Sequence, residues 1–303
     1  MIKVNSKKTK HGSHTPAYYL HRHLSARTDE HWRIDALHAS DVTKDDFCPR
    51  YMALAKLLKH KPKERPSATC DQVVYAQGRL HATMLINWFA EMGYAWGNWL
   101  CVGCGCKRLH CQRPTDCVTP KCRGKAFIYV ETRIRSKKSG ISCGIDLFLA
   151  LPGRAKLLVV EIKSYDKEKF KALKMPLADH RVRTSLYLRC LEEAGQQWAD
   201  IVDVTEADIL YVSKGGYGEK TTVPTKIWGL RDRAWSPFKT FTITRDDSLT
   251  DDYTKRALPF HEFMTDGTTP SGVCSSALAT RAENCDLRVQ CFSGKYPSGG
   301  KAK

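Results

Sequence analysis

Long apolar runs are missing from this sequence. No stretch approaches the roughly 18 consecutive apolar residues of a membrane-spanning helix, so we expect no contact with a membrane. No apolar stretch follows the basic residues of positions 1–14, so we expect no secretory signal. Internal repeats are also absent. We therefore expect a cytoplasmic globular protein of one or two domains.

Acidic residues are scarce. The 303 residues include 32 Asp and Glu against 49 Lys and Arg, which gives a net charge of +17. Residues 101–140 alone hold ten basic residues against two acidic ones, so the surplus is concentrated. A concentrated positive charge favours a polyanionic partner, most simply nucleic acid, whereas solubility alone is the alternative.

The cysteines do not come in an even number. There are 13 of them, and we expect no secretory signal, so a disulfide framework is disfavoured. In a reducing compartment, clustered cysteines favour metal binding.

Apolar periodicity predicts an α/β fold. We expect helices over residues 41–60, 70–92, 177–194 and 249–264, and strands over residues 126–134, 144–151, 156–163, 209–212 and 238–244. The expected segments are a basic arm at 1–40, a helical region at 41–100, a cysteine-rich insert at 101–125, an α/β core at 126–265, a cysteine-containing segment at 266–292 and a disordered tail at 293–303.

Two carboxylates and a lysine fall on adjacent predicted strands. Asp146 lies on the first strand, and Glu161 and Lys163 lie two residues apart on the next, so the latter two share a face. Charged groups inside an apolar run carry a desolvation cost, which a bound Mg²⁺ or Mn²⁺ would offset. Such an ion would activate a water against a phosphate, with Lys163 assisting. The alternative is a hairpin whose charged side chains face solvent.

This pattern resembles the PD-(D/E)XK nuclease superfamily, and its RecB-like branch in particular. Gly78-Arg79-Leu80-His81 is similar to a motif of that branch, which implies that His81 is a further metal ligand. The resemblance also implies that the Ile162 carbonyl binds the ion and that Tyr187 belongs to a Gln-x-x-x-Tyr motif. Arg183 stands where that motif has glutamine, so we expect it to contact a phosphate directly.

Four cysteines bracket the predicted core, namely Cys48, Cys274, Cys285 and Cys291. They resemble those of the iron–sulfur exonucleases associated with CRISPR adaptation and their phage-encoded relatives, in which four thiolates hold a [4Fe–4S] cluster. The resemblance implies a helical iron–sulfur subdomain. The ten-residue gap before the third cysteine departs from the family pattern, and four unrelated or zinc-binding thiols are the alternative.

The cysteines of the insert have the spacing of a zinc ribbon. The preferred zinc ligands are Cys101, Cys104, Cys117 and Cys122. Cys106, Cys111 and His110 are alternative ligands. Basic residues of the insert form a candidate surface for phosphates, or merely solvated charges. The candidates are Arg108, Arg113, Lys121 and Arg123.

Together these features predict a metal-dependent DNA exonuclease with an α/β PD-(D/E)XK core, a [4Fe–4S] cluster and a zinc-binding insert. The resemblance implies single-stranded DNA or DNA ends as the substrate, partners in recombination, replication or CRISPR integration, and a prokaryotic or phage-infected host. Trp96, Trp99 and Tyr94 are candidates for stacking on unpaired bases, with core packing as the alternative. A nucleic-acid-binding adaptor with weak or vestigial nuclease activity is the alternative function.

Overall fold

The computed structural model describes residues 19–20, 23–24, 35–60, 69–215, 219–220 and 235–294. Most of the expected arm at 1–40 and of the expected tail at 293–303 therefore lies outside the described residues. No helix in the described part of the chain is long and apolar enough to cross a membrane.

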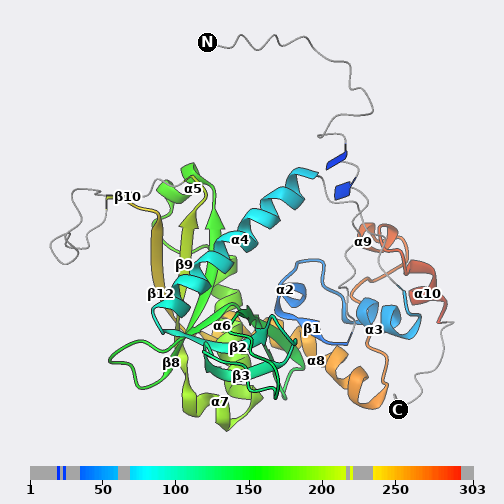
Figure 1. Ribbon diagram of the computed structural model, residues 1–303. Coiled ribbons are helices and arrows are strands. Elements are labelled where there is room, and N and C mark those ends of the chain that lie inside the picture. Colours follow the sequence, from blue (N-terminus) through cyan, green and yellow to red (C-terminus); the bar gives the residue numbers. More distant parts are fainter. Residues whose placement is uncertain are drawn as a thin grey trace.

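A seven-stranded mixed sheet forms the centre of the protein (Figure 1). Its order is β12-β9-β8-β7-β2-β3, and β4 also pairs with β2. The strands are β2 (Ala95–Cys101), β3 (Lys107–Gln112), β4 (Phe127–Val130), β7 (Leu147–Leu149), β8 (Leu157–Tyr165), β9 (Val202–Ser213) and β12 (Phe238–Thr244). Strands β8 and β9 are parallel because helices cross over between them; the other pairs are antiparallel.

Helices cover both faces of this sheet, so the predicted α/β class is confirmed. Helix α4 (Thr69–Glu91) packs Leu85 on one face of β8, against Val160 and Ile162. Helix α6 (Ala178–Ala194) packs Leu186 on the opposite face, with Val159. Helices α5 (Lys167–Ala172) and α7 (Gln196–Ile201) complete the crossover from β8 to β9.

A second sheet has three strands in the order β1-β6-β5. These are β1 (Leu37–His38), β5 (Thr132–Arg135) and β6 (Ile141–Ile145). The single strands expected over 126–134 and 144–151 are therefore wrong, since each is divided between the two sheets. The first is interrupted at Glu131 and the second at Asp146, because the chain leaves one sheet there and joins the other. A short ribbon pairs β10 (Glu219–Lys220) with β11 (Trp235–Ser236).

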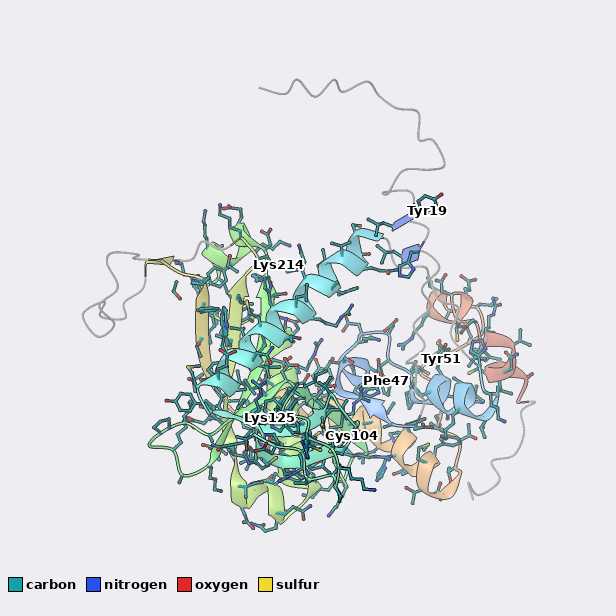
Figure 2. All side chains as sticks on the ribbon, viewed as in Figure 1. Tyr19, Phe47, Tyr51, Cys104, Lys125 and Lys214 are labelled. Atoms are coloured by element: carbon teal, nitrogen blue, oxygen red, sulfur yellow. The ribbon has the colours of Figure 1, made fainter. Side chains whose placement is uncertain are left out.

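The remaining helices lie beside the central sheet (Figure 1). They are α2 (Ala39–Val42), α3 (Pro49–Leu57), the 3₁₀-helix η2 (Asp247–Leu249), α8 (Asp251–Asp266), α9 (Thr280–Glu283) and α10 (Arg288–Ser293). Figure 2 labels Phe47 and Tyr51 in this helical part and Cys104 and Lys125 in the insert. Arg281 donates to the Phe47 carbonyl at 2.8 Å, and His60 bonds Asp286 at 2.7 Å, so the C-terminal segment is tied to the region around α3.

The single helix expected over 41–60 is wrong, because the chain forms α2 and α3 separately. Pro49 has no backbone N–H and disfavours a helical conformation in the residue before it, so a helix begins there. Cys48 is extended and acts as the cap, since its Sγ accepts a hydrogen bond from the Tyr51 N–H at 3.4 Å.

The insert is not a separate module. Its strand β3 is the last strand in the order of the central sheet and pairs with β2, from Trp96 opposite Gln112 to Leu100 opposite Lys107. The cysteine-rich turns before and after β3 therefore extend directly from the sheet that carries the predicted active site.

Candidate active site

Asp146 lies where the strand β6–β7 passes from one sheet to the other. In the smaller sheet Thr132 pairs with Ile145, and in the larger sheet Val160 pairs with Leu147. Continuing both antiparallel registers by one residue sets Glu131 on one side of Asp146 and Glu161 on the other. Three carboxylates thus approach one point in the fold.

The hairpin geometry expected for Asp146, Glu161 and Lys163 is present. The Ile162 N–H donates to Asp146 Oδ2 at 2.9 Å, and Lys163 Nζ forms an ion pair with Glu161. Glu161 is only 3% exposed, which contradicts the alternative of a solvent-facing hairpin. Alternation along β8 turns Glu161 and Lys163 toward the same face as Val159, the face that α6 covers.

Burial dominates the electrostatics of this group. Desolvation, followed by the charge of Glu161, raises the pKa of Asp146 well above its ordinary range. Desolvation lowers the pKa of Lys163, but the neighbouring Glu161 and Asp146 carboxylates outweigh it and hold that pKa above its usual value. One ammonium group therefore does not neutralise the carboxylates of the site. A divalent cation bound between them would neutralise the remaining negative charge.

Helix α6 brings Tyr187 and Arg183 to the same face. Tyr187 is buried, and desolvation and the Glu161 charge raise its pKa, so its hydroxyl stays protonated. The positive charge of Arg183 acts on both Tyr187 and Lys163. Its Nε atom is buried and makes no hydrogen bond within the described part of the chain. A half-buried arginine with an unused donor near Lys163 and Tyr187 suits a phosphate oxygen.

His81 lies on α4, one turn after Gly78. A Cβ at Gly78 would lie 3.2 Å from Ser164 Oγ, so glycine allows α4 to pack closely on β8. The Nδ1 atom of His81 is buried and has no hydrogen-bond partner among the described residues. Such an orphaned nitrogen fits a metal ligand. The side-chain atoms of His81, Asp146 and Glu161 that could bind a metal do not, however, all lie within 4.8 Å of one another.

Two residues near this site were missed from the sequence. The Glu131 carboxylate packs against Gly144, where a Cβ atom would collide with it, so the residue two before Asp146 is glycine. Burial raises the pKa of Glu131, Arg133 lowers it, and the Glu161 charge raises it again, so that the pKa lies above its ordinary value. His180 bonds the Tyr211 hydroxyl through Nδ1 at 2.6 Å, and desolvation followed by the Lys163 charge lowers its pKa. The sequence showed Glu131 only as an acid within an alternating strand, and His180 only as a histidine near the start of a predicted helix.

The four cysteines that bracket the core approach one another in the helical part. Cys48 caps α3, Cys291 lies on α10, and Arg50 donates to the Cys291 carbonyl at 2.9 Å. Burial raises the pKa of Cys291, and the charges of nearby Cys48 and Cys274 raise it further. Cys285 packs with Cys291 against Leu54, Ala55 and Leu287. A cubane cluster holds its thiolates further apart than a single ion does, so this looser grouping is compatible with it.

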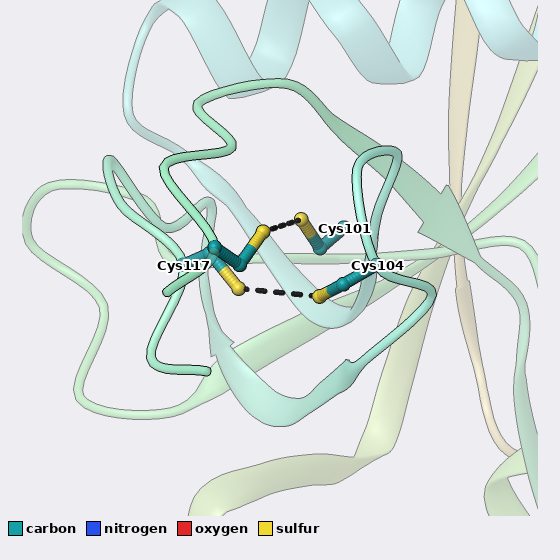
Figure 3. Close-up of side chains that lie close together, drawn as sticks. Cys101, Cys104 and Cys117 are labelled. Atoms are coloured by element: carbon teal, nitrogen blue, oxygen red, sulfur yellow. Dashed lines mark hydrogen bonds between the residues drawn. The ribbon is translucent and has the colours of Figure 1, made fainter. Parts of the chain in front are cut away.

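A tight cluster of four thiols lies in the insert (Figure 3). Cys101 Sγ is 3.8 Å from Cys122 Sγ, and Cys104 Sγ is 3.5 Å from Cys117 Sγ. All four sulfur atoms lie within 4.8 Å of one another, and among the described residues they are the only His, Cys, Asp or Glu group so close. They are the four preferred ligands of the sequence analysis.

The competing ligands of the insert differ in position. Cys106 Sγ lies 3.3 Å from Cys117 Sγ, so a fifth thiol borders the cluster. His110 instead stacks on Trp96, with ring centroids 5.7 Å apart, and is not in the cluster. Hydrogen bonds from the Thr119 hydroxyl and backbone lower the pKa of Cys117 to about 6, which favours its thiolate as a ligand.

The basic residues of the insert reach its surface. Arg108 lies on β3, where it is half-buried and pairs with the fully buried Trp99 of β2. Arg113, Lys121 and Arg123 are exposed. Their charges are therefore available to an anionic partner.

No model of a known protein family matches the chain, and no curated protein matches it. Among solved structures, the chain is similar to the alkaline exonuclease LHK-Exo from Laribacter hongkongensis, with 13% identity, a TM-score of 0.38, and coverage of 76% of this chain and 87% of that chain. A crystal structure of LHK-Exo in complex with dAMP gives 12% identity, a TM-score of 0.38, and coverage of 75% and 87%.

The raised pKa of Asp146 predicts a pH-dependent stability. Its folded-state pKa lies above the unfolded value of about 3.9, so ionisation opposes folding, and the metal-free protein loses stability as the pH rises from that value through the folded-state pKa. Asp146→Asn removes this loss. In EDTA, urea unfolding should show the variant to be more stable than wild type, with a margin that grows with pH and exceeds the roughly 0.5 kcal/mol of a surface change.

The exposed Asp45 provides a matched control, because Asp45→Asn makes the same chemical change away from the site. Adding Mn²⁺ should reverse the order of Asp146→Asn and wild type, since only the carboxylate binds the ion. A variant margin that is independent of pH would contradict the assignment of a desolvated carboxylate at position 146.

Proposed function

We propose that this chain is a divalent-metal-dependent nuclease that hydrolyses phosphodiester bonds in DNA, acting as an exonuclease on single strands or free ends. One observation carries the proposal: Asp146, Glu161 and Lys163 form a desolvated acid–acid–lysine group where the two sheets meet. Purely structural ion pairs seldom carry an uncompensated carboxylate, because desolvation penalises it.

Asp146, Glu161, His81 and the carbonyl of Ile162 would hold Mg²⁺ or Mn²⁺. Carboxylate and carbonyl oxygens are the ligands these ions prefer, and the orphaned Nδ1 of His81 adds a nitrogen donor. When bound, the ion supplies Lewis-acid polarisation of the phosphate and lowers the pKa of a water.

The side chains around the carboxylates have distinct roles in this proposal. Lys163, held in place by Glu161, orients the attacking water and stabilises charge on the phosphate. Arg183 offers its unused Nε donor to a neighbouring phosphate. Tyr187 remains protonated and positions the strand through its hydroxyl.

Two structural metal centres complete the proposal. Cys48, Cys274, Cys285 and Cys291 would hold a [4Fe–4S] cluster that fastens α3 to the C-terminal segment. Cys101, Cys104, Cys117 and Cys122 would hold zinc at the edge of the central sheet. The basic residues Arg108, Arg113, Lys121 and Arg123 would bind phosphates. We place the protein in the reducing cytoplasm of a prokaryote or phage-infected cell, at DNA ends in recombination, replication or CRISPR spacer processing.

Cleavage should depend on the lysine. Lys163→Met removes the ammonium group but keeps most of the side-chain volume, and we expect a loss of about 10²- to 10⁴-fold in cleavage of end-labelled DNA with Mg²⁺ or Mn²⁺. Binding measured in EDTA should change little. Lys169→Met, at an exposed position on α5, is the control. Wild-type cleavage by Lys163→Met would refute the assignment, whereas DNA binding without any cleavage by the wild type would favour an adaptor.

The iron–sulfur centre predicts about four iron atoms per chain and a brown colour after anaerobic purification. Cys48→Ser should lose both and lower the melting temperature by several degrees, because the link between α3 and the C-terminal segment is broken. The exposed Cys70 serves as the control in Cys70→Ser. Zinc in place of iron at this position would contradict the proposal.

The insert should contain about one zinc ion per chain. Cys117→Ser should release it, because three thiolates remain, and protease sensitivity of residues 101–125 should then rise. Cys106→Ser should keep the metal, since that thiol is outside the closest four. Zinc retained in Cys117→Ser but lost in Cys106→Ser would show that Cys106 is the ligand instead.

A further inference from the structure

Three aromatic side chains gather where the insert joins the central sheet. His110, on β3, stacks on Trp96 of β2 with ring centroids 5.7 Å apart and an interplanar angle of 26°. Trp198, on α7, meets the His110 ring edge-on at 5.0 Å. Beneath them lies the buried Phe148, stacked on Trp198 at 5.9 Å. Four rings from four separate elements therefore form one cluster.

A bulge in β3 presents the histidine. Gly97 pairs with Cys111 and Trp99 pairs with Arg108, so two residues, Leu109 and His110, fall opposite Asn98. His110 has a φ of 55°, in the left-handed region that residues other than glycine seldom occupy. The Asn98 side chain accepts its backbone N–H at 3.2 Å. Strained backbone of this kind persists where the surrounding structure enforces it, and it is concentrated at ligand sites.

The cluster has an accessible surface. His110 is exposed, and Trp96 and Trp198 are half-buried. Trp99, by contrast, is fully buried and donates its Nε1–H to the Cys111 carbonyl at 3.1 Å, so the expectation that it stacks on bases is wrong. A polar, exposed ring with one face on a tryptophan suits a flat aromatic ligand.

Phe148 connects the cluster to the strand that carries Asp146. Phe148 is two residues beyond Asp146, or about 7 Å along the strand, and alternation turns both toward the same face. Trp96 pairs directly with Phe148 on the adjacent strand. The exposed cations Lys107 and Arg113 stand at and just beyond the ends of β3, on either side of His110 along the chain. Flat rings between cations match a nucleic-acid strand whose base stacks while its phosphates pair with the charges.

We propose that Trp96, His110 and Trp198 form a platform that binds an unpaired base of single-stranded DNA near the cleavage site. This proposal rests on the proposed nuclease function, because it takes DNA as the substrate. It assigns His110 a role in binding the substrate and not in binding zinc. A base in a duplex has both faces stacked on its neighbours, so the platform selects frayed or single-stranded ends.

The test uses the full chain in EDTA, so that no cleavage occurs. Binding of a labelled oligothymidylate is compared with binding of an oligonucleotide of equal length with abasic sites throughout. His110→Asn removes the ring, and asparagine tolerates a positive φ, so the bulge is kept. Leu109→Ala, at the other residue of the bulge, is the control. Zinc content and melting temperature are measured beside each affinity.

We expect His110→Asn to bind the oligothymidylate about 5- to 10-fold more weakly than wild type, since loss of one base stack has an effect of at least this size. Its affinity for the abasic strand and its zinc content should equal those of wild type, and Leu109→Ala should resemble wild type in both. Equal affinity of wild type and His110→Asn for the oligothymidylate would overturn the platform, and so would equal losses on both strands.

The outcome separates this proposal from the nuclease function. Wild-type cleavage with Mn²⁺ together with base-independent binding would overturn the platform and leave the nuclease intact. Base-dependent binding that His110→Asn weakens, without cleavage by the wild type, would support the platform and refute the nuclease. If wild type binds neither strand, the platform is overturned.

Discussion

The desolvation of Asp146 and Glu161 is the constraint to which the rest of the structure responds. Two carboxylates held this close repel each other, and burial removes the water that would screen them. Lys163 compensates one of them, and the Ile162 N–H supports the other. Neighbouring side chains are polar for the same reason. Arg183 and His180 lie on α6, and each interacts electrostatically with Lys163. A fold selected only for stability would place apolar side chains there.

The junction of the two sheets explains how so many polar groups reach one place. A strand within a single sheet has two neighbours, and its side chains alternate between two covered faces. The strand β6–β7 changes partners at Asp146, so it brings Glu131 from one sheet and Glu161 from the other to the same residue. Gly144 allows the Glu131 carboxylate to pack beside it. The change of partners thus places the three carboxylates at the boundary between the two sheets.

Local patterns predicted much of this arrangement. The acid–acid–lysine spacing, the hairpin and α6 all follow from alternation or helical periodicity within about 20 residues, and the closest four cysteines follow from their spacing. The helix break at Pro49 also has a local cause, and it was missed because apolar periodicity was given more weight than proline. Glu131 could not be found in this way, because its role depends on the register of β5 with β6 and on the exchange of sheets. Pairing between strands is decided by packing of the whole domain.

The insert connects metal binding to the geometry of the proposed platform. Cys101 ends β2, and the other three cysteines of the cluster lie in the turns on either side of β3, so an ion held by all four would fix the hairpin that these strands form. That hairpin contains the bulge of His110, whose position depends on a register of only a few residue pairs. An edge strand with so short a register slips easily unless something else pins it. The stacking of His110 on Trp96 is one such restraint, and an ion held by the four cysteines at one end of the hairpin would be a second. Under the proposed function, an ion bound there would take no part in the chemistry. It would instead fix where the aromatic rings lie relative to Asp146, and hence which part of a bound DNA strand would reach the carboxylates.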